Sequence, residues 1–449
     1  MIKTISIHPG AVKRCSALLL ILLATTVVAG GQESRVFEFG RETHAVNTNI
    51  ITEAVQYSSD PGFGFDVENR EAVSITSAGK PLEGFCTAPV PFYFSVALPE
   101  GNYEVRVRIG NPVAKSVTTI KAESRRLMVR NLEMKKGHTE EVTFIVNIRS
   151  PRISGADSIR LKSREYNYMN WDNRLTLEFS GQNQAVQAIE IRPAKNVTTL
   201  YLAGNSTVTD QDREPWASWG QMITTYFDSR VAVANFAESG ESLASFKSSR
   251  RLEKTLTLIQ PGDYLLIEFG HNDQKRSGDG IGPWTTFTDL LTEFVTAARE
   301  KGAQPVLITP TQRRSFNDSG KISPTHGDYP AAMRKVAEAL QVPLIDLNEM
   351  TKTLYEAWGP ETSKKAFVHY PAGTFPGQEK ELKDNTHFNA FGANEIALCI
   401  LSGIMEQEIG LKEHIVNFPA DYDPSAPTDP EKWNVPLSPR FVSKKPEGN

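Results

Sequence analysis

The first half of the chain alternates apolar and polar residues with a period of two. In residues 103–109 (YEVRVRI) and 175–179 (LTLEF) every second side chain is apolar, which is the pattern of an antiparallel strand with one buried face. Turn-forming residues such as 99–102 (PEGN) separate these runs. The spacing predicts an all-β sandwich domain over residues 32–195.

Beyond Pro193 short apolar runs alternate with longer helical stretches. Residues 287–299 place Phe, Leu, Val and Ala side chains on one face of a helix. This rhythm predicts an α/β domain with a parallel sheet and helices on both faces over residues 196–415. Residues 416–449 contain prolines and acids without a period, which predicts a wrapping or disordered tail. The predicted parallel strands are residues 200–202, 231–234, 265–267, 306–308 and 343–345.

A charged and then apolar segment precedes both predicted domains. Three basic residues flank or precede the apolar run 18–24, and small residues follow it; this is typical of a cleaved signal peptide, here residues 1–31. The run is too short for a membrane span. Cys15 follows two basic residues, unlike the cysteine of a lipoprotein site. We therefore expect an exported protein, secreted or periplasmic, that has no membrane association after cleavage.

The charge balance of the 449-residue chain narrows its range of partners. The formal net charge is −4, and removal of residues 1–31, which hold three cations and no acids, takes it to −7. An acidic surface argues against nucleic acid as a partner, and a polyanionic substrate would need a local basic patch. Cys86 and Cys399 fall in different predicted domains. We expect two buried thiols, with an inter-domain disulfide as the alternative. The sequence leaves the oligomeric state open.

Polar residues suited to acyl transfer follow the predicted strands. Asp384 and His387 are three residues apart, which lets the carboxylate hold one imidazole nitrogen while the other faces a nucleophile. Ser206 follows the first apolar run of the second domain, in the turn AGNST. Gly240 and Asn272 follow the next two runs. Because the carboxyl ends of parallel strands meet at one edge of a sheet, we expect these residues to lie close together.

The order of these motifs resembles that of the SGNH (GDSL-like) hydrolases, and within them the rhamnogalacturonan acetylesterases of carbohydrate esterase family 12. The resemblance covers residues 197–412 and implies the three-layer, flavodoxin-like α/β fold of SGNH hydrolases. It also implies a serine esterase with Ser206, His387 and Asp384 as catalytic residues. One position departs from the family pattern. Members usually carry Asp before the nucleophile, whereas this chain has Asn205, which keeps a side-chain acceptor but loses the charge.

The resemblance also implies an oxyanion hole made by the backbone N–H groups of Ser206 and Gly240 and by the side-chain amide of Asn272. The serine mechanism needs no cofactor or metal, and the sequence has no HExxH motif or close Cys/His spacing. Motifs in residues 37–40 and 188–191 resemble those of galactose-binding-like modules attached to pectin-active enzymes. The first domain is therefore a candidate for carbohydrate binding.

Some positions remain open to more than one interpretation. Ser242 lies in a near match to the G-x-S-x-G elbow of α/β-hydrolases, with Ala244 in place of the last glycine, and is an alternative nucleophile. Trp216 and Trp219 could pack against a sugar or only against the first helix. Basic side chains that could meet galacturonate carboxylates, or simply be solvated, are Lys275, Arg276, Arg313 and Arg314.

Together these observations predict an exported esterase that removes acetyl groups from a pectic polysaccharide, with rhamnogalacturonan as the expected substrate. One alternative is an SGNH esterase for acetyl-xylan, a lipid or another small ester, because the fold and the triad do not fix the alcohol. The other alternative is a non-catalytic carbohydrate-binding surface protein with an inert hydrolase domain. Asn205 is the motif position that points to this second alternative.

Overall fold

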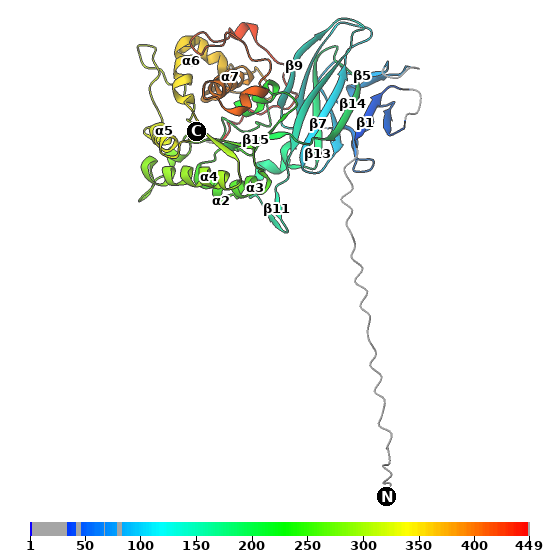
Figure 1. Cartoon of the computed structure of the whole chain (residues 1–449). Coiled ribbons are helices and arrows are strands. Elements are labelled where there is room, and N and C mark those ends of the chain that lie inside the picture. The colour runs from blue at the N-terminus through cyan, green and yellow to red at the C-terminus, as the bar shows by residue number, and fades with distance from the viewer. Residues whose placement is uncertain (2–33, 42–45, 67, 79–82, 448–449) are drawn as a thin grey trace. The chain divides into compact units, whose positions relative to one another are not determined.

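The structure, a computed structural model, describes Met1 and residues 34–41, 46–66, 68–78 and 83–447. Apart from Met1, the predicted signal peptide lies outside the described residues. From residue 34 onward the chain forms one unit, in which a β-rich part is followed by a mixed α/β part (Figure 1).

Two large sheets build most of the β-rich part, and β11 (Arg152–Ser154) and β12 (Asp157–Ser158) form a small hairpin beside them in the chain. The strands of the first sheet are β1 (Arg35–Phe39), β2 (Thr48–Ile51), β4 (Ser74–Thr76), β5 (Phe85–Thr87), β7 (Gly101–Ile109), β10 (Glu140–Ile148) and β14 (Ala185–Pro193). Those of the second are β3 (Phe63–Asp66), β6 (Phe92–Ala97), β8 (Ser116–Ala122), β9 (Arg126–Met134) and β13 (Arg174–Gln182). The first sheet has the order β10-β7-β14-β1-β2, with β5 and β4 attached through β14, and the second has the order β3-β6-β13-β8-β9.

Aromatic side chains from both sheets share one hydrophobic core. The rings of Phe37 and Phe39 on β1 lie 5.2 and 5.4 Å from the ring of Phe94 on β6, measured between centroids. All three side chains are at most 1% exposed. Successive residues of a strand point to opposite faces, so residues two apart enter the same core. This explains the period of two, and each buried ring contributes about 1.5–3 kcal/mol of hydrophobic stabilisation.

A parallel sheet forms the centre of the α/β part. Its strands are β15 (Thr198–Gly204), β16 (Val231–Asn235), β17 (Tyr264–Glu268), β18 (Gln304–Ile308) and β19 (Leu344–Ile345). They pair in the order β16-β15-β17-β18-β19, and every pair is parallel. From β15 the chain first adds β16 on one side of that strand and then adds β17, β18 and β19 on the other side. In such sheets, ligands bind outside the carboxyl ends of the strands where the order reverses, which here is between β15 and β17.

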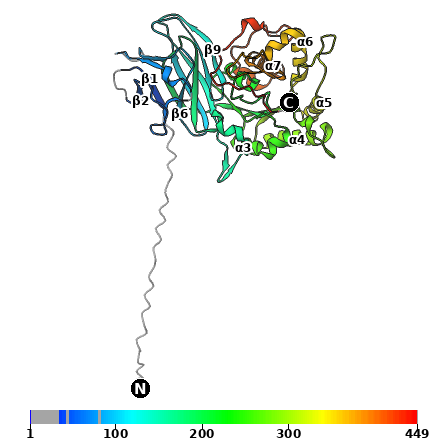
Figure 2. The ribbon, with the colours of Figure 1, turned by 180° about the vertical axis from the view of Figure 1, so that it is seen from behind.

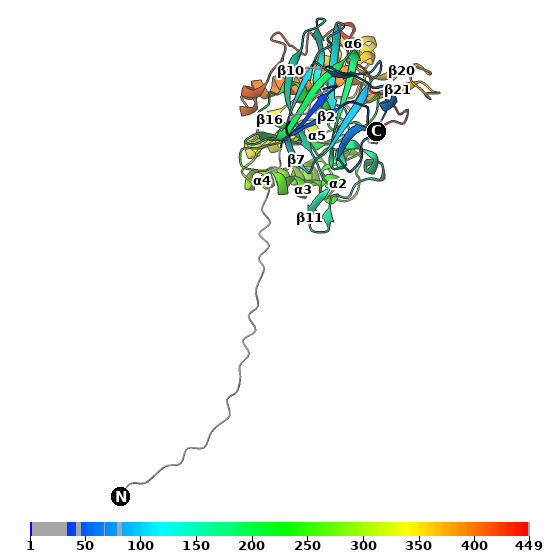
Figure 3. The ribbon, with the colours of Figure 1, turned by 90° about the vertical axis from the view of Figure 1, so that its right-hand side faces the viewer.

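The two faces of this sheet belong to different hydrophobic cores. Leu200 and Leu202 of β15 pack in the core that includes α1, α6 and α7, whereas Tyr201 and Ala203 pack in the core that includes α2 to α5. In two views α6 lies on one side of the sheet and α2, α3 and α4 lie on the other (Figure 1, Figure 3). The helices are α1 (Trp219–Met222), α2 (Leu243–Ser248), α3 (Arg251–Leu258), α4 (Thr288–Glu300), α5 (Tyr329–Leu340), α6 (Leu347–Thr362) and α7 (Ala390–Glu406).

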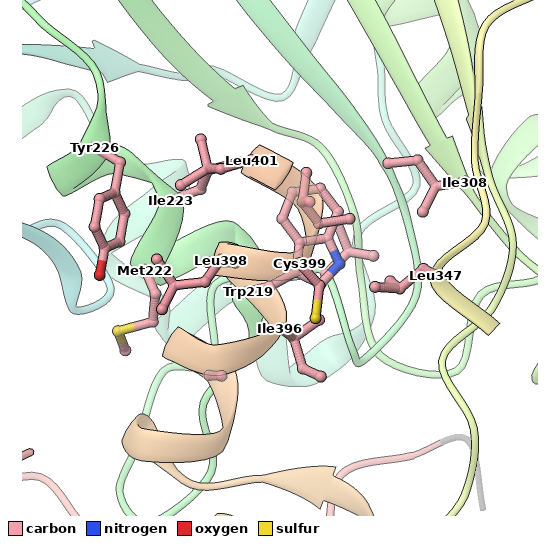
Figure 4. Packing of buried hydrophobic residues seen from close by; sticks show 14 of the residues in the cluster. Trp219, Met222, Ile223, Tyr226, Ile308, Leu347, Ile396, Leu398, Cys399 and Leu401 are labelled. Atoms are coloured by element: carbon pink, nitrogen blue, oxygen red, sulfur yellow. The ribbon is translucent and has the colours of Figure 1, made fainter. Parts of the chain in front are cut away.

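Helix α7 is apolar around most of its circumference, and neighbouring elements cover it. Figure 4 shows Leu398 and Cys399 of α7 among Trp219 and Met222 of α1. A helix that is apolar on all sides is expected to be buried. Cys399 is a free thiol, as is Cys86 in the β-rich part, so the expected buried thiols are present and the alternative disulfide between them is not formed.

The described part of the predicted tail, residues 416–447, wraps around the fold. Trp433 is buried against the core that contains α7. Further along, Lys121 of β8 donates to the carbonyl oxygen of Pro436 (2.7 Å) and to the hydroxyl of Ser438 (2.8 Å). The lack of a periodic pattern in this segment therefore reflects an extended path held by individual side-chain contacts.

Buried ion pairs join the β-rich part to the α/β part. Arg251 of α3 lies 2.6 Å from Glu165, and both side chains are 0% exposed. Arg149 lies 2.8 Å from Asp210, with 2% and 0% exposed. Figure 2 shows β9 at the edge of the β-rich part that faces α7. Buried charges are tolerated when they are paired and hydrogen-bonded, so these pairs fix the two parts to each other.

Candidate active site

Ser206 lies in a turn that directly follows β15. Gly204 ends the strand, and a Cβ atom built on it would come within 2.4 Å of Val208 Cγ2, so this position needs glycine. The side-chain oxygen of Asn205 accepts hydrogen bonds from the backbone N–H (3.0 Å) and the hydroxyl (2.9 Å) of Thr207. Asn205 thus supplies the side-chain acceptor that the turn requires.

His387 connects Ser206 to Asp384. Its Nε2 atom lies 2.7 Å from Ser206 Oγ, and its Nδ1 atom lies 2.7 Å from Asp384 Oδ2. Ser206, His387 and Asp384 are each at most 2% exposed. The acid and the histidine both belong to β21 (Leu382–Phe388), so a rigid element sets their spacing. In this arrangement an imidazole can remove the proton of a serine hydroxyl while a carboxylate orients the ring.

Several donors hold the carboxyl group of Asp384 in its charged form. Burial alone would raise its pKa, but the hydrogen bond and charge of His387 and the backbone N–H of Thr386 hold that pKa well below its usual range. The indole N–H of Trp216 donates to Asp384 Oδ2 at 3.2 Å, and Lys445 Nζ lies 3.5 Å from Oδ1. The structure therefore places Trp216, which is buried, against the carboxylate that contacts His387 Nδ1.

Gly240 and Asn272 line one surface cavity of about 470 Å³. Gly240 has a φ of +84°, a backbone conformation that glycine adopts without strain. The side-chain N–H₂ of Asn272 donates to the carbonyl oxygen of Glu241 (3.0 Å), and its Oδ1 accepts from Lys275 Nζ (3.2 Å). A side-chain amide carries two N–H bonds, so the contact with Glu241 uses one of them. The second donor can serve a ligand in the cavity.

Two buried acids support the loops of the site and were missed in the sequence. Glu268, the last residue of β17, accepts a hydrogen bond from Trp219 Nε1 (2.5 Å), and its Oε1 lies 2.9 Å from Thr207 Oγ1. Burial raises its pKa to about 7, against the lowering effect of these contacts. Asp273 accepts from two backbone N–H groups (2.9 and 3.0 Å), and burial raises its pKa to about 6. The sequence feature that could have revealed Glu268 is an acidic residue placed directly at the end of an apolar run.

The predicted basic residues fall into two groups. Lys275 and Arg276 line the cavity that contains Gly240 and Asn272. Burial, and then repulsion from neighbouring cations, lowers the pKa of Lys275 to about 8. In contrast, Arg313 donates to a threonine hydroxyl (3.0 Å) and Arg314 to a serine hydroxyl (2.9 Å). The geometry therefore favours the first pair as substrate contacts, and these roles, like that of Trp216, remain predictions.

Ser242, the alternative nucleophile, has a different local role. It is the N-cap residue of α2, and its hydroxyl accepts a hydrogen bond from the backbone N–H of Ser245 at 3.2 Å. Serine is a preferred residue at this position because it satisfies a helix N–H that has no backbone partner. The imidazole of His387 contacts Ser206, so the geometry favours Ser206 as the nucleophile.

Two buried histidines near the site are neutral. The rings of His271 and His326 lie 4.5 Å apart between centroids. Burial lowers both pKa values, to about 3 for His326.

Within the described ranges, no three His, Cys, Asp or Glu side chains are grouped so that they could hold a metal ion. The same part of the chain has no helix of the length and apolar character needed to cross a membrane.

Known proteins are similar to this chain over its α/β part and, in some cases, over most of its length. Residues 202–394 match the GDSL-like Lipase/Acylhydrolase family. Rhamnogalacturonan acetylesterase RhgT from Bacillus subtilis (strain 168) is 46% identical over 225 residues, which are 50% of this chain and 96% of RhgT. Probable rhamnogalacturonan acetylesterase YesY from the same organism is 34% identical over 48% of this chain and 97% of YesY. Among solved structures, Bacillus subtilis YxiM is 25% identical over 84% of this chain and 99% of YxiM, with a TM-score of 0.44.

Proposed function

Since the chain belongs to the GDSL-like lipase/acylhydrolase family, we propose that it removes acetyl groups from rhamnogalacturonan. It is a carboxylic ester hydrolase, as its family and its similarity to rhamnogalacturonan acetylesterases indicate. The observation that carries the proposal is the 2.7 Å contact between His387 Nε2 and Ser206 Oγ, in a chain 46% identical to RhgT over the matched residues. A fold and a triad do not fix the alcohol of the ester, so the choice of polymer rests on these relatives.

In the proposed reaction Ser206 is the nucleophile and His387 is the general base. Ser206 Oγ attacks the carbonyl carbon of the acetyl group while His387 Nε2 takes the hydroxyl proton, and the carbonyl oxygen becomes negatively charged. The tetrahedral intermediate then breaks the bond to the sugar oxygen, to which His387 gives its proton. Water attacks the carbonyl carbon of the acetyl-serine while His387 Nε2 takes a proton from the water. The second tetrahedral intermediate breaks its bond to Ser206 Oγ, to which His387 returns the proton, and acetate is released.

Neighbouring groups would stabilise the charges that develop in this reaction. Asp384 would orient the imidazole and stabilise it when it is protonated, in keeping with the 2.7 Å contact to His387 Nδ1. The backbone N–H groups of Ser206 and Gly240 and the amide of Asn272 would donate to the oxyanion. This assignment is supported by the shared cavity of Gly240 and Asn272.

The proposal extends to the rest of the chain. We propose that the two sheets of the β-rich part form a β-sandwich, because their aromatic side chains share one core. We also propose that this sandwich binds carbohydrate, since residues 37–40 and 188–191 resemble motifs of galactose-binding-like modules. The α/β part would have three layers, since separate cores cover the two faces of its sheet. Export after removal of residues 1–31, to a secreted or periplasmic location, would bring the enzyme to a polymer outside the cell.

Acetate release tests the proposal directly. The purified chain is incubated with acetylated rhamnogalacturonan, acetyl-xylan and p-nitrophenyl acetate, and acetate is measured over time. We expect the highest kcat/KM for rhamnogalacturonan. Ser206→Ala should reduce turnover by several orders of magnitude on all three substrates, while the matched variant Ser242→Ala keeps it. Activity that survives in Ser206→Ala but not in Ser242→Ala would overturn the catalytic assignment, and a preference for acetyl-xylan would overturn the substrate.

A further inference from the structure

A second cavity next to the triad is lined by cations from the β-rich part. Its volume is about 760 Å³, and its lining includes Lys162, Arg164, Trp216 and Ser239. The two cations lie at the start of a short 3-10 helix (Ser163–Asn167), in the segment of the β-rich part that precedes β13. Trp216 also donates to the carboxylate of the triad. The cavity therefore borders the site where the ester would react.

Both cations are held in place by one turn of the α/β part, residues 238–241. Arg164 donates to Glu238 Oε1 from Nε (3.0 Å) and Nη2 (2.6 Å), and from Nη2 to the carbonyl oxygen of Ser239 (2.8 Å). Lys162 Nζ donates to the same carbonyl oxygen (2.5 Å) and lies 2.9 Å from Glu241 Oε1. Glu238 and Glu241 are 2% and 1% exposed. The positive groups are thus already ordered, which lowers the entropic cost of binding an anion.

A carboxylate of the chain itself binds to the outer side of these cations. Arg164 Nη1 lies 2.6 Å from Glu447 Oε1, and Lys162 Nζ lies 3.9 Å from Glu447 Oε2. The side chain of Glu447 is 58% exposed, against 28% for each cation. The hydrogen bond from Arg164 lowers the pKa of Glu447, so it binds as an anion. A guanidinium whose Nε and Nη2 atoms are fixed by the protein can offer its remaining nitrogen, here Nη1, to a carboxylate.

The bound carboxylate lies beside the proposed oxyanion hole. A Cβ atom built on Gly240 would be 3.4 Å from Glu447 Oε2, and Glu447 lines the smaller cavity together with Asn272. Five basic and two acidic side chains line the larger cavity. The surroundings of Glu447 therefore combine a fixed pair of cations, an excess of positive charge and closeness to the reacting ester.

We propose that Lys162 and Arg164 form a subsite for the carboxylate of a uronate sugar, and that Glu447 occupies this subsite in the absence of substrate. The identity of the sugar rests on the function proposed above, because rhamnogalacturonan alternates a neutral sugar with an acidic one. A galacturonate unit would displace Glu447 and take over its ion pair with Arg164 Nη1. Since the segment is tethered next to the subsite, its effective concentration is high, on the order of mM. Glu447 would therefore reduce the apparent affinity for acidic sugars.

Calorimetric titration of the inactive Ser206→Ala chain with an unacetylated galacturonate trisaccharide at low salt tests this subsite. We expect Arg164→Gln, added to Ser206→Ala, to weaken binding at least about tenfold. Glu447→Gln should tighten binding about three- to tenfold, because the competing carboxylate is gone. Arg160→Gln, at a nearby exposed position, is the matched control and should leave the affinity unchanged. The methyl-esterified trisaccharide should show neither effect.

The two substitutions separate a ligand site from a structural anchor. If Lys162 and Arg164 only hold residues 442–447 in place, Arg164→Gln and Glu447→Gln will act in the same direction or not at all on binding, and that result would overturn the proposal. The assay uses an inactive chain and a sugar without acetyl groups. A failure of acetate release from rhamnogalacturonan would therefore leave the subsite standing, and loss of the subsite would leave the esterase assignment standing.

Discussion

Asn272 is the residue whose proposed role depends most on chemistry that occurs only in the transition state. Its neutral amide keeps both N–H donors at any working pH, and one of them is already held by the carbonyl oxygen of Glu241. We expect Asn272→Ala to lower kcat about a hundredfold or more with little change in KM, because the oxyanion does not exist in the bound substrate. Asn272→Asp should lower kcat further, since it places a negative charge at the oxyanion. Steady-state hydrolysis of p-nitrophenyl acetate checks both variants, and an effect confined to KM would make Asn272 a substrate-binding residue.

Asp384 offers a second test at the residue scale. Its pKa is held below the usual range, so it remains a carboxylate across neutral pH and can accept from His387 Nδ1. Asp384→Asn keeps the shape but can donate to that nitrogen, which favours the wrong imidazole tautomer, and kcat/KM should fall roughly 10³- to 10⁴-fold. Trp216→Phe removes one hydrogen bond to the same carboxylate and should lower kcat/KM about two- to tenfold. Equal losses in the two variants would show that Trp216 does more than support Asp384.

Among the elements, the end of β17 connects the turn that carries Ser206 to α1 through Glu268. Its pKa is raised from 4.5 to about 7, mainly by burial. Below pH 4.5 it is protonated in both the folded and unfolded chain. Between pH 4.5 and 7 the unfolded chain releases the proton while the folded chain retains it, so stability falls as pH rises, by on the order of 3 kcal/mol in total. Glu268→Gln should remove this part of the pH dependence.

Urea unfolding at pH 4.5, 6 and 8 measures that effect. Glu300→Gln, at an exposed position of α4, serves as the control and should retain the full fall in the free energy of unfolding. Other buried acids titrate in the same interval, so the comparison between the two variants is the informative quantity. The same pH dependence in Glu268→Gln and Glu300→Gln would show that Glu268 is already ionised below pH 6 in the folded chain.

Elements whose cause is local were predictable from the sequence. The alternating run 103–109 lies in β7, and the apolar run 200–202 lies in β15, because each pattern reflects consecutive side chains that face one core. The helix predicted at 287–299 begins one residue later and ends one residue later, as α4. A π-helical turn, Pro283–Phe287, precedes it and begins with a proline, which fits a first turn.

Contacts between distant segments were not predictable in this way. The motif order pointed to Ser206, His387 and Asp384, and the structure brings these side chains together. Nothing local marks Arg164 or Glu447 as neighbours of that site, because the segment that carries Glu447 has no period and its position depends on side-chain contacts made far along the chain. Single charged residues in irregular segments carry no pattern from which a partner can be inferred.

Across the whole molecule, the buried pair of Arg251 and Glu165 makes the β-rich part and the α/β part depend on each other. Glu165 accepts from Arg251 Nη2 through both oxygens (2.7 and 2.6 Å) and from the indole N–H of Trp171 (3.0 Å). Removal of the cation would leave an uncompensated buried charge. We expect Arg251→Met to lower the free energy of unfolding by about 3–5 kcal/mol, whereas Lys335→Gln, which breaks an exposed pair, should change it by at most about 1 kcal/mol.

Because the pair spans both parts, Arg251→Met should destabilise both of them. Far-ultraviolet circular dichroism follows the helices of the α/β part, and hydrogen exchange of β7 and β13 amides follows the β-rich part. Cooperative unfolding of one unit predicts that both signals move to lower urea concentration together in Arg251→Met. If only the helical signal shifts while the exchange of β7 and β13 is unchanged, the β-rich part is an independently stable module, and its cations would reach the active site only as long as that docking contact holds.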